Sequence, residues 1–251
     1  MAGIGLFLRS DDPAGGGDRA GATGLTFDYA IRRSARARNI RITVDRDGVV
    51  VTVPERVAER HGHAFVRERE QWIERSLAKL AAEEAAVAAR PLTDASHVPY
   101  LGNELLLRLL HGASGRAHLA NSGELRLRVP DHGRDTVASA LERWYRRRAR
   151  VEIKARLDAV VARNGTAYKR LTIRDQRSRW GSCSSTGTLS FNWRLMLAPE
   201  LVLDYVVEHE AAHIEVPDHS KRFWALMDER VDDWRGARDW LRHHGGTLRL
   251  I

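Results

Sequence analysis

The sequence predicts an α+β fold in which a small mixed sheet packs on helices and a β-rich unit comes first. Between residues 25 and 132, apolar and polar residues alternate in several short runs, which is the period of half-buried strands. From Asp135 to Arg163, apolar residues recur at helical spacing. A further helix after Pro199 carries an apolar face and, near its end, two histidines and a glutamate.

Length and composition indicate how these elements are grouped. A chain of 251 residues, 43% of them hydrophobic, is long enough to bury a full core. Residues 1–24 are rich in Gly, Ala and Asp, so we expect a disordered tail there. Residues 25–132 are expected to form a β-rich unit with one helix, and residues 133–251 a second domain that carries the chemistry.

The β-rich unit is predicted from turn and periodicity signals. Apolar residues alternate with polar ones in 40–44 and again in 49–53, and Asp47-Gly48 between the two runs indicates a hairpin. Residues 64–89 have the pattern of an amphipathic helix, which Pro91 stops because proline cannot continue it. Two more short strands are predicted at 105–110 and 125–129.

The net charge of +8 points weakly to a polyanionic partner. Lysine occurs only at positions 79, 154, 169 and 221, so nearly all the basic residues are arginines in an alanine-rich chain, which is typical of genomic composition bias. The cluster of Arg32, Arg33, Arg36, Arg38 and Arg41 fits either an acidic partner or a solvated strand face. We favour the solvated face, and nucleic-acid contact has little support from charge alone because no aromatic residues are interleaved.

Cys183 is the only cysteine, so the chain forms no internal disulfide, consistent with a reducing cytoplasm. A lone cysteine is more often a small buried thiol than a nucleophile, and we interpret Cys183 in that way. The apolar start at Ile4–Leu8 is too short for a signal peptide. No apolar stretch is long enough to cross a bilayer, so we expect a cytoplasmic protein without a membrane partner.

The second domain begins with the long helix, which Asn164-Gly165 should end because glycine adopts the left-handed conformation that closes helices. Residues 171–173 and 188–195 are predicted strands, joined through the turn at 184–187.

The helix after Pro199 contains a spacing that metal chemistry requires. Residues four apart stack on one helix face, so His209 and His213 can offer two imidazole nitrogens to one cation. Glu210 beside them has the general-base position of the H-E-x-x-H pattern. His219 lies six residues further on, and the chain must turn back near Val216–Asp218 for it to join the pair.

The alternative is that these histidines are hydrogen-bonded core residues without a metal. Unpartnered polar groups on a buried helix cost about 1–3 kcal/mol each, so the histidines and Glu210 need some partner. A metal satisfies all of them at once, and we favour it. Three histidine ligands leave the fourth position to water, which is the open arrangement of catalytic zinc.

The run from 177 to 224 resembles the YgjP-like metal-dependent hydrolases, a zincin group related to the SprT-like and WLM-type metalloproteases. The specific matches are W-G-S-C-S at 180–184, N-W-R at 192–194 and H-S-x-x-F-W at 219–224. A weaker resemblance covers most of the chain. The family more often has Leu and then Ala or Cys where this chain has Ala211-Ala212, a change that affects packing more than chemistry.

This resemblance implies a zincin-like metallopeptidase domain at 133–251, with His209, His213 and His219 as the metal ligands and Glu210 as the catalytic base. It also implies that a strand beside the metal helix pairs with extended substrate. Such pairing gives affinity through main-chain hydrogen bonds, but which strand has the free edge cannot be read from the sequence.

Several neighbours of the motif have open roles. Arg177, Arg179 and Arg194 would stabilise an oxyanion or hold a phosphate, or instead form ion pairs. The acids we considered as their partners are Asp175, Asp204 and Glu208. Phe223, Trp224 and Met227 are predicted to be core beneath the metal. One spare carboxylate is expected to orient a ligand histidine, the candidates being Asp228, Glu229, Asp232 and Asp233.

These features predict a zinc-dependent hydrolase, in the first instance a metallopeptidase in which Glu210 activates a zinc-bound water against a peptide or protein substrate. All-imidazole sites also accept other first-row ions. One alternative is a nucleoside triphosphate pyrophosphohydrolase whose arginines hold the nucleotide phosphates. The other is a non-catalytic basic binding module with a structural metal, which would require a fourth protein ligand.

Overall fold

The computed structural model describes residues 19–20, 24–112, 116–176 and 179–251. The chain separates into two compact units: a C-terminal unit, Ala89–Ile251, and an N-terminal unit that holds the described residues up to Ala88. This boundary differs from the expected one at 132/133. Most of the expected tail at 1–24 lies outside the described residues, but Arg19–Ala20 forms strand β1.

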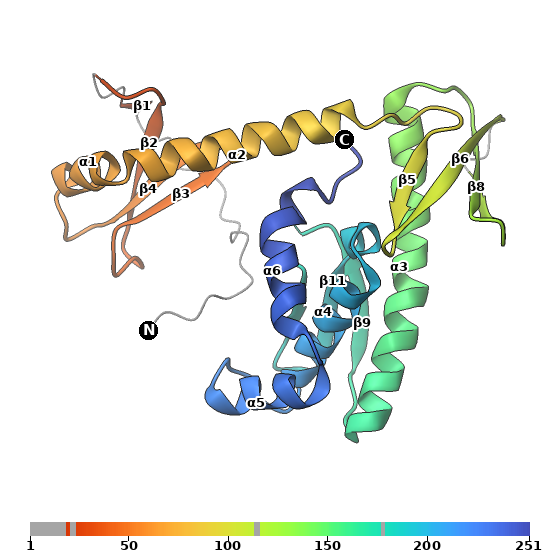
Figure 1. Cartoon of the computed structure of the whole chain (residues 1–251). Coiled ribbons are helices and arrows are strands. Elements are labelled where there is room, and N and C mark those ends of the chain that lie inside the picture. The colour runs from red at the N-terminus through yellow and green to blue at the C-terminus, as the bar shows by residue number, and fades with distance from the viewer. Residues whose placement is uncertain (1–18, 21–23, 113–115, 177–178) are drawn as a thin grey trace. The chain divides into compact units, whose positions relative to one another are not determined.

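The N-terminal unit is a sheet in the order β1-β2-β4-β3, followed by two helices (Figure 1). Strand β2 is parallel to β4, while β1 and β3 are antiparallel to their neighbours. The elements are β1 (Arg19–Ala20), β2 (Tyr29–Ser34), β3 (Arg41–Asp45), β4 (Gly48–Pro54), α1 (Glu59–Glu68) and α2 (Glu70–Ala89).

The predicted hairpin and helix are both present in this unit, the helix in altered form. Asp45 pairs with Gly48 across the β3–β4 turn, and Gly48 has φ 117°, a left-handed conformation that glycine adopts without strain. Helix α1 begins earlier than the predicted residue 64, and the helical segment is broken at Arg69, where no proline or glycine marks the break. Val66 of α1 and Ile73 of α2 pack with the alternating valines of β4 in one core.

The C-terminal unit contains two sheets and the remaining helices. One sheet has the order β5-β6-β8-β7 and the other β10-β11-β9. Its strands are β5 (His97–Tyr100), β6 (Asn103–His111), β7 (Ala117–Leu119), β8 (Glu124–Val129), β9 (Arg170–Arg174), β10 (Gly181–Cys183) and β11 (Thr188–Asn192). Its helices are α3 (Arg134–Asn164), η1 (Trp193–Leu197), α4 (Glu200–Ala212), α5 (Lys221–Arg230), α6 (Trp234–His244) and η2 (Gly245–Thr247).

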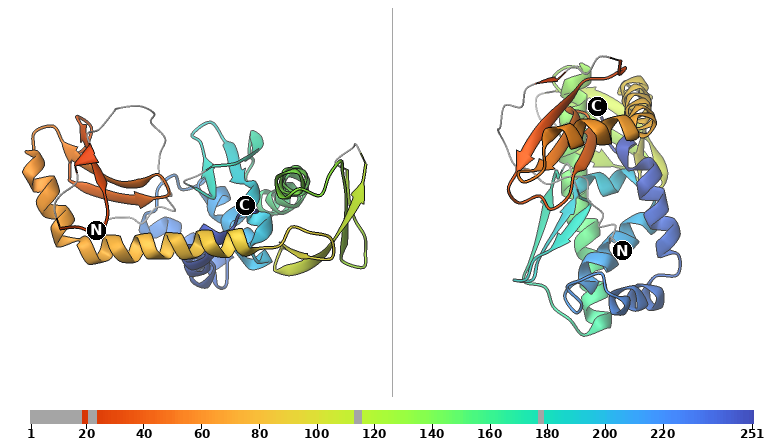
Figure 2. Two further views of the ribbon diagram at one scale, coloured as in Figure 1. Left: turned by 90° about the horizontal axis from the view of Figure 1, so that it is seen from above. Right: turned by 90° about the vertical axis from the view of Figure 1, so that its left-hand side faces the viewer.

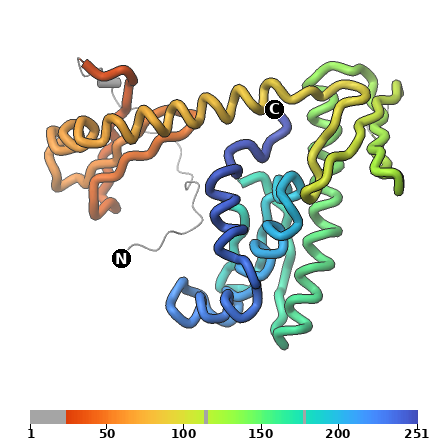
Figure 3. The backbone as a smooth tube through the Cα atoms, in the orientation of Figure 1, coloured from red at the N-terminus to blue at the C-terminus, as the bar shows by residue number. Residues whose placement is uncertain are grey.

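Helix α3 is the element that both sheets contact. It runs without interruption (Figure 3), and the left view of Figure 2 shows it nearly end-on between the two sheets. It ends as predicted, because Gly165 takes φ 64° and its N–H bonds to the carbonyl of Val161. None of the helices in the described ranges is long and apolar enough to cross a membrane.

The shared core explains why β5–β8 belongs with the C-terminal unit. Trp144 and Tyr145 of α3 contact Tyr100 of β5 on one side and Trp193 of η1 on the other. The buried hydroxyl of Tyr145 donates to the carbonyl of Pro99, 2.5 Å away. The apolar face of the β5–β8 sheet is therefore buried by α3 itself, which leaves it no separate core.

Three strands of the C-terminal unit, β5, β7 and β10, were not predicted. Residues 171–173 and 188–192 are strands, but they pair in parallel, and the turn at 184–187 joins β11 to the intervening β10. The predicted second strand also stops early, because residues 193–197 form the 3₁₀ helix η1. Asn192 caps that helix, its side chain accepting from the N–H of Arg194.

If β5–β8 shares a core with α3, then Leu107→Ala in β6 should destabilise α3 as well as the sheet. We expect the free energy of unfolding of the C-terminal unit to fall by about 2–5 kcal/mol, because Leu107 is fully buried. Hydrogen–deuterium exchange of α3 and η1 measures this. The matched variant Ile73→Ala should weaken protection in β2–β4 and spare α3. Unchanged exchange in α3 of Leu107→Ala would contradict the shared core.

Candidate metal centre

The three histidines come together because the chain reverses at the end of α4. Helix α4 ends at Ala212, and His213 is its C-cap. The N–H groups of Glu215 and Val216 both bond back to the carbonyl of Ala212, at 3.1 and 2.9 Å. This tight turn and Pro217 end the helix, and His219 returns toward His209 just before α5 begins.

The ring nitrogens converge as ligands of one ion would. Nε2 of His219 lies 3.1 Å from Nε2 of His209, and one nitrogen from each histidine lies within 4.8 Å of the others. Two nitrogens on a tetrahedral zinc are roughly 3.3 Å apart, given zinc–nitrogen bonds of about 2.0–2.1 Å. The donor set therefore fits a divalent metal, with small adjustment of His213.

Hydrogen bonding and burial both favour the form of these imidazoles that could bind a metal. The carbonyl of Val216 accepts a hydrogen bond from Nδ1 of His213 at 3.0 Å, which leaves the Nε2 lone pair of His213 for a metal. Burial lowers the pKa of His209 well below its usual value, and lowers that of His213 and His219. A lowered pKa favours the neutral imidazole, which is the form that binds metals.

An aromatic layer supports the histidines from α5. The ring of Phe223 lies 4.9, 4.5 and 4.8 Å, between centroids, from the rings of His209, His213 and His219. Trp224 stacks on His219 at 5.6 Å. The prediction that these residues form the core beneath the site is confirmed, since Phe223 and Met227 are fully buried and Trp224 packs against the same cluster.

Glu210 is enclosed between α4 and strand β10. It is only 6% exposed, and burial raises its pKa to about 8, while the positive charge of Arg179 and the N–H of Cys183 oppose that shift. Gly181 makes the enclosure possible. A Cβ on Gly181 would lie 2.7 Å from Oε1 and 2.8 Å from Cδ of Glu210. The close approach of strand to carboxylate therefore depends on glycine at position 181.

A second buried carboxylate, Glu208, ties together the elements that carry the histidines. It is 2% exposed, accepts from Asn164 at 3.0 Å and is ion-paired with Arg163 at the end of α3. Arg230 of α5 lies 3.8 Å from it. Arg230 also makes a two-pronged pair with Glu215, at 2.7 and 3.1 Å, in the turn after His213.

The sequence did not identify this network as a unit, although Glu208 had been considered as a partner for an arginine. An acidic residue one position before the first histidine, on an otherwise apolar helix, was the available signal. Its partners come from α3 and α5, which are far apart in sequence, so only the fold shows the pairing.

Comparison with known proteins agrees with this geometry. The model of the YgjP-like metallopeptidase domain matches residues 38–244 of the 251. The chain belongs to the YgjP-like family. No curated protein and no solved structure matches the chain significantly. Family membership and the three-histidine group together support a metal-dependent hydrolase.

The arginines near the site in this YgjP-like protein have different partners. Arg194 pairs with Asp175 at 2.9 Å, which is one of the ion pairs considered from the sequence. Arg179 instead acts electrostatically on Glu210. Arg177 lies outside the described residues. Cys183 is half-buried where a buried thiol was expected, and burial raises the pKa of its thiol, which disfavours the nucleophilic thiolate.

In two of the three histidines, a group other than the expected carboxylate contacts the Nδ1 atom. Among the described residues, the Nδ1 partner of His213 is the carbonyl of Val216, and that of His209 is the hydroxyl of Tyr205 at 3.5 Å. Asp228, one of the expected candidates, accepts from the indole of Trp234 and pairs with Arg235.

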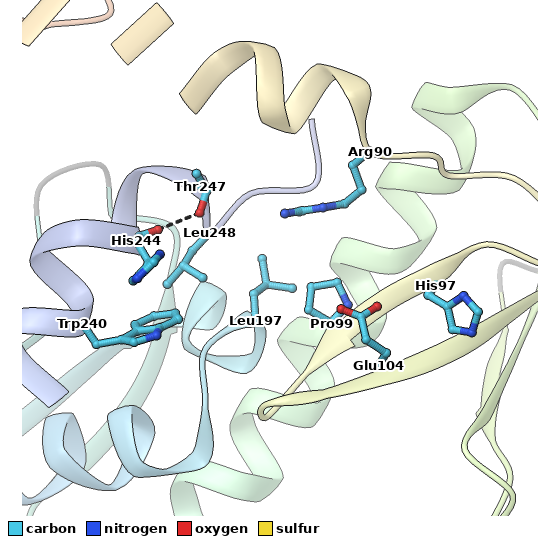
Figure 4. A pocket seen from close by; sticks show the side chains of 9 residues that line it. All are labelled: Arg90, His97, Pro99, Glu104, Leu197, Trp240, His244, Thr247 and Leu248. Atoms are coloured by element: carbon cyan, nitrogen blue, oxygen red, sulfur yellow. Dashed lines mark hydrogen bonds between the residues drawn. The ribbon is translucent and has the colours of Figure 1, made fainter. Parts of the chain in front are cut away.

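A cavity of about 290 Å³ in the YgjP-like domain lies away from this centre (Figure 4). Neither the three histidines nor Glu210 lines it, and its walls include Arg90, Glu104, Leu197, Trp240 and His244. Part of the hydrogen-bonding capacity of Arg90 is already used, because it donates to the carbonyl of Arg249. We therefore base the chemistry on the histidine group and assign no role to this cavity.

Gly181→Ala should disturb the metal centre without touching a histidine. The added methyl would overlap the carboxylate of Glu210, so we expect a loss of about 1–3 kcal/mol in stability and a displaced Glu210 side chain. Urea denaturation and a crystal structure of the variant check both outcomes. Ser182→Ala on the same strand should behave like the wild type. A Gly181→Ala protein with native stability and an unmoved Glu210 would show that the contact is loose.

Proposed function

We propose that the protein is a zinc-dependent metallopeptidase with a zincin-like fold in its C-terminal unit. In this proposal His209, His213 and His219 are the metal ligands, and Glu210 is the general base. The observation that carries it is the convergence of three imidazole nitrogens next to a buried carboxylate. Within the described residues the histidine group has three members, which leaves an open position for water or substrate.

In this proposal, Glu210 and its neighbours have separate roles in peptide hydrolysis. When bound, zinc supplies Lewis acidity, which polarises a carbonyl and lowers the pKa of a water from about 15.7 to about 7. Glu210 accepts the proton from the attacking water and later delivers it to the leaving amine. The N–H of Cys183 and the charge of Arg179 favour its carboxylate form. Val216 and Phe223 hold the imidazole of His213 in place.

Strand β10 offers an edge where an extended peptide would bind. In the described part of the sheet, β10 pairs only with β11. The carbonyl of Trp180 and the N–H of Ser184 bond to β11, so by antiparallel alternation the backbone groups of Gly181 and Cys183 face the other way. The N–H of Cys183 meets Glu210 on that side. A peptide paired with this edge would therefore have its backbone beside the general base.

Two alternatives remain as outcomes of experiment. A nucleoside triphosphate pyrophosphohydrolase is favoured by the positive charge of Arg179 next to Glu210, since guanidinium binds phosphates well. A non-catalytic module with a structural metal would require a fourth protein ligand, which the histidine group of the described residues does not include.

Glu210→Gln separates catalysis from metal binding. Glutamine keeps the size of the side chain but does not accept a proton, so we expect hydrolysis to fall by at least about 100-fold. The metal content should remain one ion per chain, because Glu210 is not a proposed ligand. Metal analysis and a peptide-hydrolysis assay measure the two effects. Hydrolysis at the wild-type rate would show that another group is the base.

His219→Ala should remove metal binding and hydrolysis together. Loss of one imidazole weakens the site, so we expect the bound metal to be lost on dialysis, together with the activity. His243→Ala, at the end of α6, is the matched control and should retain both. Running the wild type on casein-derived peptides and on nucleoside triphosphates decides the substrate class. Release of pyrophosphate without peptide cleavage would replace the peptidase assignment with the phosphoanhydride one.

A further inference from the structure

Arginines gather at one end of the sheet in the N-terminal unit, far from any residue of the metal centre in sequence. We call Arg32, Arg36, Arg38, Arg41 and Arg56 the arginine surface. Residues 35–40 connect β2 to β3 across the end of β4, and Arg56 follows β4, where it donates to the carbonyl of Arg38. All five side chains are exposed.

Strand register places two of these arginines on the open face of the sheet. Arg32 and Arg41 both pair with Thr52 of β4, so the three residues form one row across the sheet. Their Cα atoms are roughly 10 Å apart, because neighbouring strands are about 4.8 Å apart. Helix α1 covers the other face, where Gly62 approaches Val51 and Val53. Arg32 donates to the hydroxyl of Thr52 at 3.2 Å.

The arginine surface contains unbalanced positive charge. Within the described residues, none of its five arginines forms an ion pair. Several arginines of the C-terminal unit are ion-paired by contrast, and Arg156 pairs with Glu152, Glu200 and Asp204. Composition bias accounts for many arginines, and the feature of this end is that five exposed ones gather here without an ion pair in the described part of the chain.

Acidic residues are few around the surface. Asp45 shares the open face but lies four residues from Arg41, roughly 13 Å along β3. Glu55 is adjacent, and its carbonyl accepts from Arg33. Close, unpaired cations repel one another, so an anionic partner that spans several of them would be stabilised.

We propose that the arginine surface binds the phosphate backbone of a nucleic acid. Guanidinium groups match phosphate oxygens with two parallel hydrogen bonds. The open face near the arginines carries Ala30, Thr43 and Val50 and no aromatic residue, so it has no platform for stacking bases. Binding is therefore through charge and independent of base sequence. The proposal concerns a site other than the metal centre and holds whatever the enzyme's substrate is.

The double variant Arg32→Gln/Arg41→Gln tests this surface in the full-length protein. Its matched control is Arg60→Gln/Arg75→Gln, which removes the same charge from exposed positions on α1 and α2 of the same unit. The probes are a fluorescein-labelled single-stranded RNA and its duplex, read by anisotropy between about 50 and about 200 mM salt. Melting temperatures establish that both variants remain folded.

We expect the surface variant to bind RNA at least tenfold more weakly than the wild type. The slope of log K against log salt should fall by about 1 for each arginine that contacts phosphate. Two RNAs of different sequence should behave alike, and the control variant should bind like the wild type. Equal weakening in the control would assign binding to net charge and overturn the proposal. Absence of RNA binding, or arginine-dependent binding to phosphatidylserine vesicles alone, would also overturn it.

Discussion

The burial of three consecutive polar side chains is the constraint on which the site depends. Glu208, His209 and Glu210 are 2%, 4% and 6% exposed in the last turns of α4, among buried apolar residues. A buried polar group is tolerated only when it has a partner. Each of the three finds its partner on a different element: α3 for Glu208, the loop before α5 for His209, and β10 for Glu210. The arrangement of α3, β10 and the loop before α5 around α4 supplies these partners.

This constraint also positions the third histidine. His219 lies in a loop, and a loop residue holds a ligand geometry only if its supports are fixed. Arg230 anchors the preceding turn through Glu215 and approaches Glu208, while Phe223 and Trp224 pack against the imidazoles. The charge network and the aromatic layer therefore both support this loop, although neither provides a proposed ligand.

Features defined by local spacing were predictable from the sequence. The histidine spacing on α4, the reversal near Val216, the α3 boundary at Gly165 and the hairpin at Gly48 each follow from a rule that applies within a few residues. Features defined by distant partners were not. Strand β10 has three residues and no alternation, and it is a strand because it pairs with β11 and encloses Glu210. The unit boundary likewise depends on α3 burying the β5–β8 sheet, which no local pattern reports.

Charge distribution gives a further contrast between the two units. In the C-terminal unit, many arginines pair with acids that lie two to more than forty residues away, and the long-range pairs stabilise contacts between elements. Exposed pairs of this kind contribute little individually to the free energy of unfolding. Arg156 and Arg230, however, each pair with more than one acid, and such networks connect neighbouring helices. In the N-terminal unit, the arginine surface has no such use. An arginine without an acidic partner leaves much of its hydrogen-bonding capacity to solvent or to a ligand, and on this basis we propose a recognition role for the arginine surface.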